Sequence, residues 1–145
     1  MRHELTIAAL RDAVMPLLAP TVREVSFSDE HPKTWTLLGG STGIVCEVEY
    51  CGNWYVQLDD WYVLELWSVG ETRLTIFLAS FDVKPVQLVT ARIGARVVGS
   101  WLRFADGIEF EDPTWMDKLI ARCRGYSLQV TPWVTGTERF DLIPD

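Results

Sequence analysis

The chain has few of the residues that build metal centres and nucleophilic active sites. Its 145 residues include two histidines and three cysteines, with no C-x-x-C or H-x-x-x-H pair. Because metal sites need several such ligands at short spacings, the sequence predicts neither a metal nor a cofactor. It also lacks a glycine-rich phosphate loop with a lysine and a dinucleotide fingerprint.

Long apolar runs are missing as well. No uncharged apolar stretch approaches the roughly 18 residues of a membrane span, and the apolar run near the N-terminus is too short for a signal peptide. We therefore expect a soluble, cytoplasmic protein without a membrane partner.

Basic residues are scarce in the first half of the chain. Eight acidic residues lie between Asp29 and Glu71, where Lys33 is the only Lys or Arg, and the whole chain has a net charge of −7. An acidic surface repels phosphate backbones, so we expect no direct nucleic-acid binding. The charge favours a basic partner, although solubility alone would also account for it.

Apolar and aromatic residues are abundant. Hydrophobic residues make up 48% of the chain, which contains seven tryptophans. This is enough for a packed core, and the length predicts a single domain over residues 1–145.

The first half reads as a helix followed by strands. Residues 4–18 place Leu10, Val14, Leu17 and Leu18 at helical spacing, with a disturbance near Pro16. An extended piece over residues 22–27 comes next. Short segments rich in strand formers, separated by turn signals, then predict an antiparallel meander of about five strands; they read TWTLL, GIVCEVEY, WYVQL, WYVLELW and RLTIFLASF.

The second half reads as two helices and a hairpin. Asp82 would cap a helix over residues 84–104, with an apolar stripe at Val86, Val89, Ile93, Val97, Trp101 and Phe104. A second helix is predicted over residues 113–125, and YSLQVTPWV and ERFDLI would form a C-terminal β-hairpin, with Pro132 placing its first strand at an edge or a bulge. Strands and helices in separate runs indicate an α+β fold.

Two motifs resemble catalytic sites without their structural context. GGSTG matches the G-x-S-x-G elbow of hydrolases, but a strand rather than a helix follows it, so we interpret it as a hairpin turn. Glu109, Glu111 and Asp112 form an acidic cluster that is more typical of an exposed edge and a helix cap than of acid–base catalysis. We expect no enzymatic activity, and an enzyme using this cluster is the third alternative.

The stretch NWYVQLDDWYVLELW (residues 53–67) gives the candidate binding surface. Strand alternation places Tyr62, Leu64 and Leu66 on a core face and Trp61, Glu65 and Trp67 on the other. By the same alternation, Glu47 and Glu49 face away from the apolar side of their strand. Asp59 and Asp60 would form the tip of a hairpin. The predicted partner-binding residues are therefore Glu47, Glu49, Asp59, Asp60, Trp61, Glu65 and Trp67.

The order of these segments resembles the small immunity proteins of bacterial polymorphic-toxin and contact-dependent growth inhibition systems. The segments that carry the resemblance are TWTLLGG, NWYVQLDDWYVLELW, ASFDVKPVQLVTARIG and RGYSLQV. The resemblance implies a single-domain, cysteine-poor, acidic α+β protein that binds and blocks a cognate toxin. These families place their toxin-binding residues differently, so the resemblance assigns no site.

Composition and resemblance together favour a non-enzymatic immunity protein. Its acidic residues would steer a basic toxin, such as a nuclease, and its tryptophans would anchor it, so that the toxin's active site is occluded. The alternative is a small-ligand-binding α+β domain in which a helix closes over an aromatic-lined sheet and the tryptophans lie inside.

Overall fold

The chain packs as two compact units. In the computed structural model the first unit comprises Met1–Asp59 and Leu64–Val83, and the second comprises Asp60–Val63 and Lys84–Asp145. The residues that the structure describes are 6–63, 71–104, 108–111 and 127–133. The single domain expected over residues 1–145 stays a prediction.

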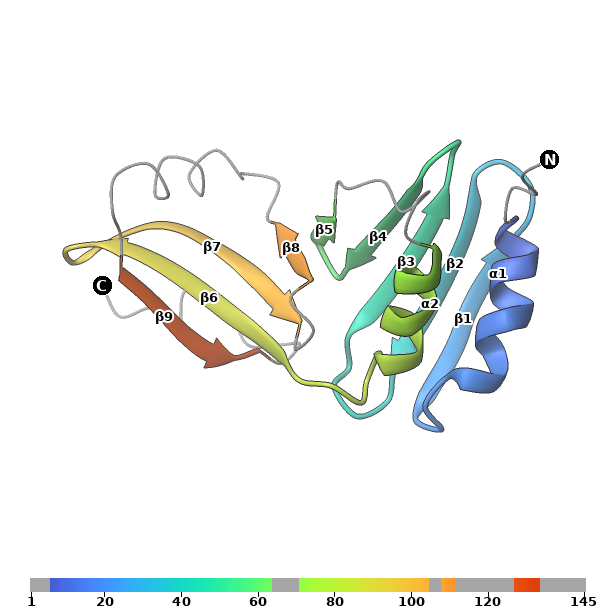
Figure 1. Cartoon of the computed structure of the whole chain (residues 1–145), viewed down its shortest axis with the longest axis horizontal. Helices are drawn as coiled ribbons and strands as arrows, with labels where there is room; N and C mark the ends of the chain where they lie inside the picture. The colour runs from blue at the N-terminus through green and yellow to red at the C-terminus, as the bar shows by residue number, and fades with distance from the viewer. Residues whose placement is uncertain (1–5, 64–70, 105–107, 112–126, 134–145) are drawn as a thin grey trace. The chain divides into compact units, whose positions relative to one another are not determined.

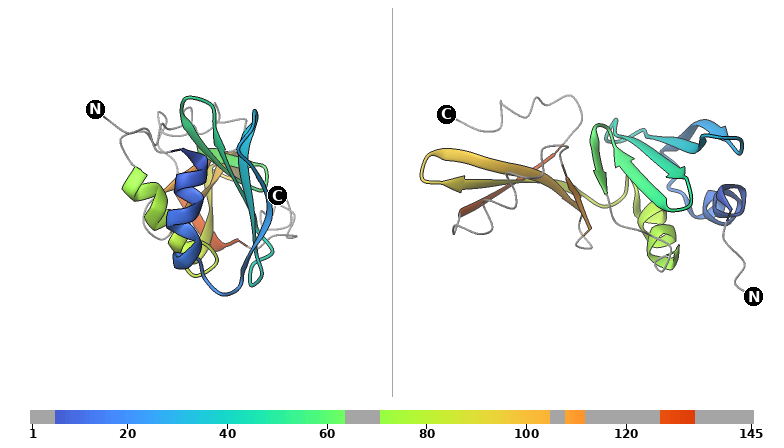
Figure 2. Two further views of the ribbon diagram at one scale, coloured as in Figure 1. Left: turned by 90° about the vertical axis from the view of Figure 1, so that its right-hand side faces the viewer. Right: turned by 90° about the horizontal axis from the view of Figure 1, so that it is seen from above.

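The first unit is an antiparallel meander with two helices on one face (Figures 1 and 2). Its strands lie side by side in chain order: β1 (Val22–Ser28), β2 (Lys33–Gly39), β3 (Val45–Tyr50) and β4 (Trp54–Leu58). The helices are α1 (Ile7–Val14) and α2 (Glu71–Ser80), and α1 contacts both α2 and β2. The α+β class and the N-terminal helix are confirmed.

Helix α1 forms where the sequence predicts a helix, but it is shorter. Thr6 caps it, since its hydroxyl accepts a hydrogen bond from the Ala9 amide at 3.0 Å. The helix gives way to a 3₁₀ turn, Met15–Leu17, because proline at residue 16 cannot donate the hydrogen bond that would continue it. Leu17, expected in the apolar stripe, is instead 52% exposed.

The core of the first unit lies between the helices and the inner face of the sheet. Alternate strand residues point inward and are fully buried, as strand geometry requires; they include Trp35, Leu37, Cys46, Val48, Trp54, Val56 and Leu58. Each such side chain stabilises the fold by about 1.5–3 kcal/mol through burial. The strands predicted over residues 22–58 are therefore confirmed.

The strand predicted for RLTIFLASF is wrong, because this segment forms most of α2. Leu74, Phe77, Leu78 and Phe81 are buried, whereas Ile76 is 52% exposed. Buried positions at i, i+3, i+4 and i+7 are the pattern of one helix face. A short apolar run is compatible with either a strand or a helix. Here the segment forms a helix that packs against α1.

The long helix predicted over residues 84–104 is also wrong. This segment is a β-hairpin of β6 (Val86–Ile93) and β7 (Arg96–Phe104). The turn between the two strands contains Gly94, whose φ is 62°. The segment is rich in β-branched residues, which favour strands, and a positive φ suits glycine. Residues from both faces of β6 are buried, so its apolar positions do not alternate. Their spacing therefore resembles that of the apolar face of a helix.

The second unit is an antiparallel sheet in the order β5-β8-β7-β6-β9. Besides the hairpin it contains β5 (Trp61–Val63), β8 (Glu109–Glu111) and β9 (Ser127–Pro132). Among the described strands β9 is the last in this order, which agrees with the edge or bulge that Pro132 predicted. The helix expected over residues 113–125 and the strand ERFDLI lie outside the described residues.

Asp82 does not cap a helix but binds the turn between β2 and β3. Its carboxylate accepts hydrogen bonds from the Ser41 amide at 3.0 Å, the Thr42 amide at 3.1 Å, the Thr42 hydroxyl at 2.8 Å and the Thr21 hydroxyl. Partial burial raises the pKa of Asp82, but the hydrogen bonds outweigh it and hold this pKa below its ordinary value. The GGSTG motif is thus a hairpin turn, as predicted.

No helix among the described residues has the length and apolar character needed to cross a membrane.

Candidate functional site

The face of the first sheet that points away from the two helices is the candidate site. We call it the outer face and define it by strand register: where inner residues are buried, their neighbours along each strand point outward. The outer face consists of Arg23, Ser26 and Ser28 on β1; Thr34, Thr36 and Leu38 on β2; Val45, Glu47 and Glu49 on β3; and Tyr55 and Gln57 on β4.

Glu47 and Glu49 lie in the middle of this outer face. Both glutamates are half-buried. Cys46 and Val48, which alternate with them along β3, are fully buried on the inner side, so the predicted outward orientation of the glutamates is confirmed. Glu47 is flanked by Thr36 and Gln57 across the sheet. Among the described residues, neither carboxylate has a hydrogen bond or an ion pair. The two charges are therefore uncompensated and available to a cationic group.

Apolar and aromatic side chains border the glutamates. Leu38 and Val45 pair directly at one end of the outer face, and Val45 is 37% exposed. At the other end, Tyr55 pairs with Glu49 and is half-buried. Tyr55 was not among the predicted binding residues, although the alternation of Trp54, Tyr55 and Val56 indicates its outward direction. Arg23 is the only base on the outer face as defined.

Asp59 and Asp60 occupy the turn after β4, as predicted. The Asp59 carboxylate accepts a hydrogen bond from the Val45 amide at 2.9 Å, and its own amide donates to the Val45 carbonyl at 2.8 Å. The Asp59 carbonyl accepts a bond from the Gln57 side chain at 2.6 Å. Asp59 therefore fixes the start of β3 in place, whereas Asp60 is exposed.

The structure describes one of the two predicted aromatic anchors. Trp61 has no exposed area, so the expectation that it lies on an exposed face is corrected: strand alternation separates two faces but does not show whether either face is covered. Trp35 and Trp54 are likewise 0% and 1% exposed. Glu65 and Trp67 lie outside the described residues, so their predicted roles stay predictions.

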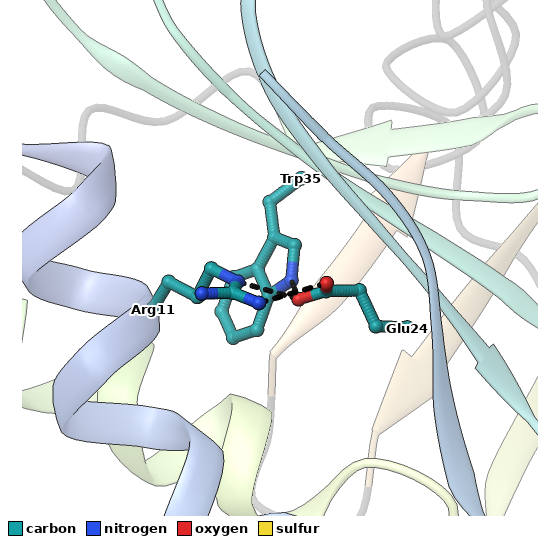
Figure 3. Close-up of polar contacts among 3 residues, drawn as sticks. All are labelled: Arg11, Glu24 and Trp35. Atoms are coloured by element: carbon teal, nitrogen blue, oxygen red, sulfur yellow. Dashed lines mark hydrogen bonds and ion pairs between the residues drawn. The ribbon is translucent and has the colours of Figure 1, made fainter. Parts of the chain in front are cut away.

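An ion-paired cluster on the opposite, inner side supports the sheet (Figure 3). Glu24 on β1 accepts two hydrogen bonds from Arg11 of α1, at 2.6 and 2.9 Å, and one from the indole of the buried Trp35 at 2.9 Å. The Arg11 guanidinium also lies over the Phe27 ring at 4.8 Å. The hydrogen bond from Arg11 contributes most to holding the pKa of Glu24 below its ordinary value. This cluster attaches α1 to the inner face of the sheet.

Within the described ranges, no group of three or more histidine, cysteine or acidic residues is arranged to hold a metal ion. Comparison of the chain with protein-family models, with curated proteins and with solved structures finds no match. The site must therefore be judged on its own geometry.

Proposed function

We propose that this protein is a non-enzymatic immunity protein that binds a basic toxin through the outer face of its first sheet and occludes the toxin's active site. The single observation that carries the proposal is the pair of uncompensated carboxylates, Glu47 and Glu49, on the face of the first sheet that points away from the two described helices of this unit. Alternate residues of one strand lie about 7 Å apart, so the two glutamates form a short row of negative charge. This row has the same sign of charge as the phosphates along a nucleic acid. A nuclease is therefore the favoured class of toxin.

The surroundings of the glutamates suit recognition as well as steering. Threonine hydroxyls and the Gln57 amide supply donors and acceptors around the charges, and Tyr55, Leu38 and Val45 supply contact area at the ends. Aromatic and aliphatic contacts give an interface much of its affinity, while charges mainly set its association rate and partner choice.

The outer face is too small to be the whole interface. Four strands, each about 4.8 Å wide and about 20 Å long, cover roughly 400 Å². Stable complexes bury about 800 Å² on each partner. The partner must therefore extend beyond the outer face.

Co-expression tests the proposal directly. The product of the open reading frame beside this gene should be toxic alone, harmless in the presence of this protein, and recovered in a complex with it on gel filtration. A neighbour that is harmless alone and forms no complex would refute the immunity function.

Charge reversal tests the surface. Glu47→Lys and Glu49→Lys should each slow association with the toxin by about tenfold at low salt, and the difference should shrink as salt rises. Asp12→Lys is the matched control, because Asp12 is an exposed acid of α1 on the opposite side of the sheet. If Asp12→Lys slows association as much as the glutamate variants do, net charge rather than the outer face determines binding.

The alternative, a small-ligand-binding domain, draws support from the burial of Trp35 and Trp54 in the first unit. A cavity lined by these rings would bring an apolar ligand into contact with them. Saturable quenching of tryptophan fluorescence by such ligands, without complex formation with any toxin, would favour this function over the first.

A further inference from the structure

Three oxygen-bearing side chains lie in one cross-strand row in the middle of the outer face. Glu47 pairs with Thr36 on one side and with Gln57 on the other. The Gln57 side-chain amide donates a hydrogen bond to the Asp59 carbonyl at 2.6 Å, which fixes this amide and leaves its oxygen as an acceptor. Neither the Glu47 carboxylate nor the Thr36 hydroxyl has a partner among the described residues. The row therefore fits a group that only donates hydrogen bonds, such as an ammonium or a guanidinium.

The neighbouring cross-strand row places an aromatic ring beside a carboxylate. Glu49 pairs with Tyr55 on β4 and with Thr34 on β2. The Cβ atoms of directly paired residues lie about 5 Å apart, so a planar cation bound to Glu49 would reach the Tyr55 ring. A guanidinium binds a carboxylate through two parallel N–H groups and stacks on an aromatic face, whereas an ammonium is a compact point charge. This row therefore fits an arginine better than a lysine.

The spacing of the rows fits an extended chain rather than a helix. Val45, Glu47 and Glu49 are alternate residues of β3, so they span about 14 Å along the strand. An extended partner segment presents the side chains of one face at the same interval of about 7 Å. Residues i, i+4 and i+7 of a helix span only about 10.5 Å, so a helix cannot match all three positions. Sheets packed face to face also keep their strands within about 30° of each other, which would hold such a segment along β3.

A second copy of this chain does not fit the outer face. Two copies packed through this face would bring Glu47 and Glu49 of one copy towards those of the other, with Arg23 as the single base on each copy of the face as defined. Like charges brought together in an interface oppose binding. Anionic surfaces such as a phosphate backbone are repelled for the same reason. Charge complementarity therefore selects a segment of another, basic protein.

We propose that the outer face docks an extended segment of the toxin that presents, at alternate positions along β3, an apolar residue, a base and an arginine. The apolar residue lies against Val45, where Leu38 widens the apolar surface, and the base lies against Glu47. The arginine lies between the Glu49 carboxylate and the Tyr55 ring. This inference rests on the proposed function, because it names the segment by which the toxin is recognised.

The probe is a backbone-cyclised β-hairpin peptide, titrated into the full-length chain and followed by amide chemical shifts. One strand of the peptide carries a valine, a lysine and an arginine at alternate positions, so that all three lie on one face. The matched control peptide has the same composition but places the arginine next to the lysine, which turns the two bases to opposite faces. We expect the shifts to centre on β3 and β4 and the control peptide to bind about threefold to fivefold more weakly, since it engages one base at a time.

Two variants of Tyr55 separate stacking from charge. In the parent, a peptide with arginine opposite Tyr55 should bind about twofold to fivefold more tightly than one with lysine there. Tyr55→Leu removes the ring and should abolish this preference, whereas Tyr55→Phe should retain it. Glu49→Gln should weaken binding of the arginine peptide about threefold to fivefold. Asp12→Asn is the matched control on α1, on the opposite side of the sheet, and should leave binding unchanged.

Comparisons between peptides on the parent protein keep the test decisive if a variant unfolds. Equal binding of the same-face and opposite-face peptides would overturn the proposal, and so would equal binding of the arginine and lysine peptides. Shifts centred away from β3 and β4, or no binding at millimolar peptide, would overturn it as well. Failure here is distinct from failure of the proposed function: a toxin neutralised on co-expression while the peptides show no preference would refute this recognition segment and leave the immunity function intact.

Discussion

Substitution of Gly39 by alanine tests the fit between the β2–β3 turn and Asp82. The new Cβ would lie 2.5 Å from the Asp82 Oδ1 atom and 2.9 Å from both the Asp82 Cγ atom and the Thr42 hydroxyl oxygen. Real Cβ atoms do not approach other atoms so closely, so the carboxylate or the turn must move. Gly39 itself is buried, which leaves little room for the movement.

The cost follows from two contributions. Overpacking of a tight site costs about 1–3 kcal/mol. Displacement of the carboxylate also weakens its four hydrogen bonds, and solvent access to Asp82 keeps this second contribution to roughly 1 kcal/mol in total. We expect the free energy of unfolding of Gly39→Ala to fall by about 2–4 kcal/mol, measured by urea denaturation with tryptophan fluorescence.

A double-mutant cycle with Asp82→Gly isolates the contact. Without the carboxylate the added methyl group loses two of its three closest contacts and keeps the one with the Thr42 hydroxyl, so the alanine should cost at least about 1 kcal/mol less in the Asp82→Gly background. Gly52→Ala is the control for backbone strain alone, because Gly52 has a φ of 87° and nothing lies within 4 Å of its added Cβ; it should cost about 1–2 kcal/mol. Additive effects of Gly39→Ala and Asp82→Gly would refute the steric explanation.

Three further outcomes follow from the pKa values, thiols and hydrogen bonds of the first unit. Because the pKa of Asp82 is lower in the folded than in the unfolded chain, where it is about 4, its carboxylate contributes stability above that pH and loses it as the pH falls through the folded value. As the pH is lowered from about 5 to 2, the free energy of unfolding should therefore fall less in Asp82→Asn than in the parent, as measured by urea denaturation at each pH. Parallel plots of unfolding free energy against pH would contradict this. In a Cys123→Ser background, Cys51 should react with a thiol reagent at neutral pH, whereas Cys46, whose pKa is raised by burial and by the nearby Glu47 charge, should react only after unfolding; two fast thiols would show that β3 opens. Trp35→Phe, which removes the indole donor to Glu24, should lower the free energy of unfolding by about 1–3 kcal/mol, and a loss below about 0.5 kcal/mol would mean that this hydrogen bond contributes nothing.

The candidate site was predictable where strand alternation is strict. Glu47 and Glu49 alternate with Cys46 and Val48, and this pattern alone placed the glutamates on the face opposite the core. The role of Asp59 was not predictable, because the hydrogen bond from its carboxylate joins it to Val45, fourteen residues earlier, and sequence shows no such pairing. The charge of a residue indicates what it could bind, but not whether a neighbouring amide already binds it.

The burial of Trp61 was not predictable from the sequence either. Its neighbours in sequence suggested a surface of acids and aromatics, yet Trp61 has no exposed area. Strand alternation assigns side chains to two faces, but only tertiary packing determines whether one or both of these faces are covered.

The sequence by itself determined the α+β class, the N-terminal helix and the meander from β1 to β4, because local turn signals and a period of two residues encode them. Tertiary structure decided that residues 71–80 form a helix and residues 86–104 a hairpin. In both segments the apolar spacing fits two periods, so the choice depended on which surface the rest of the chain offered for burial. The pairing of Asp59 and Asp82 with one turn was likewise decided in three dimensions, since hydrogen bonds between distant residues form only after the strands are assembled.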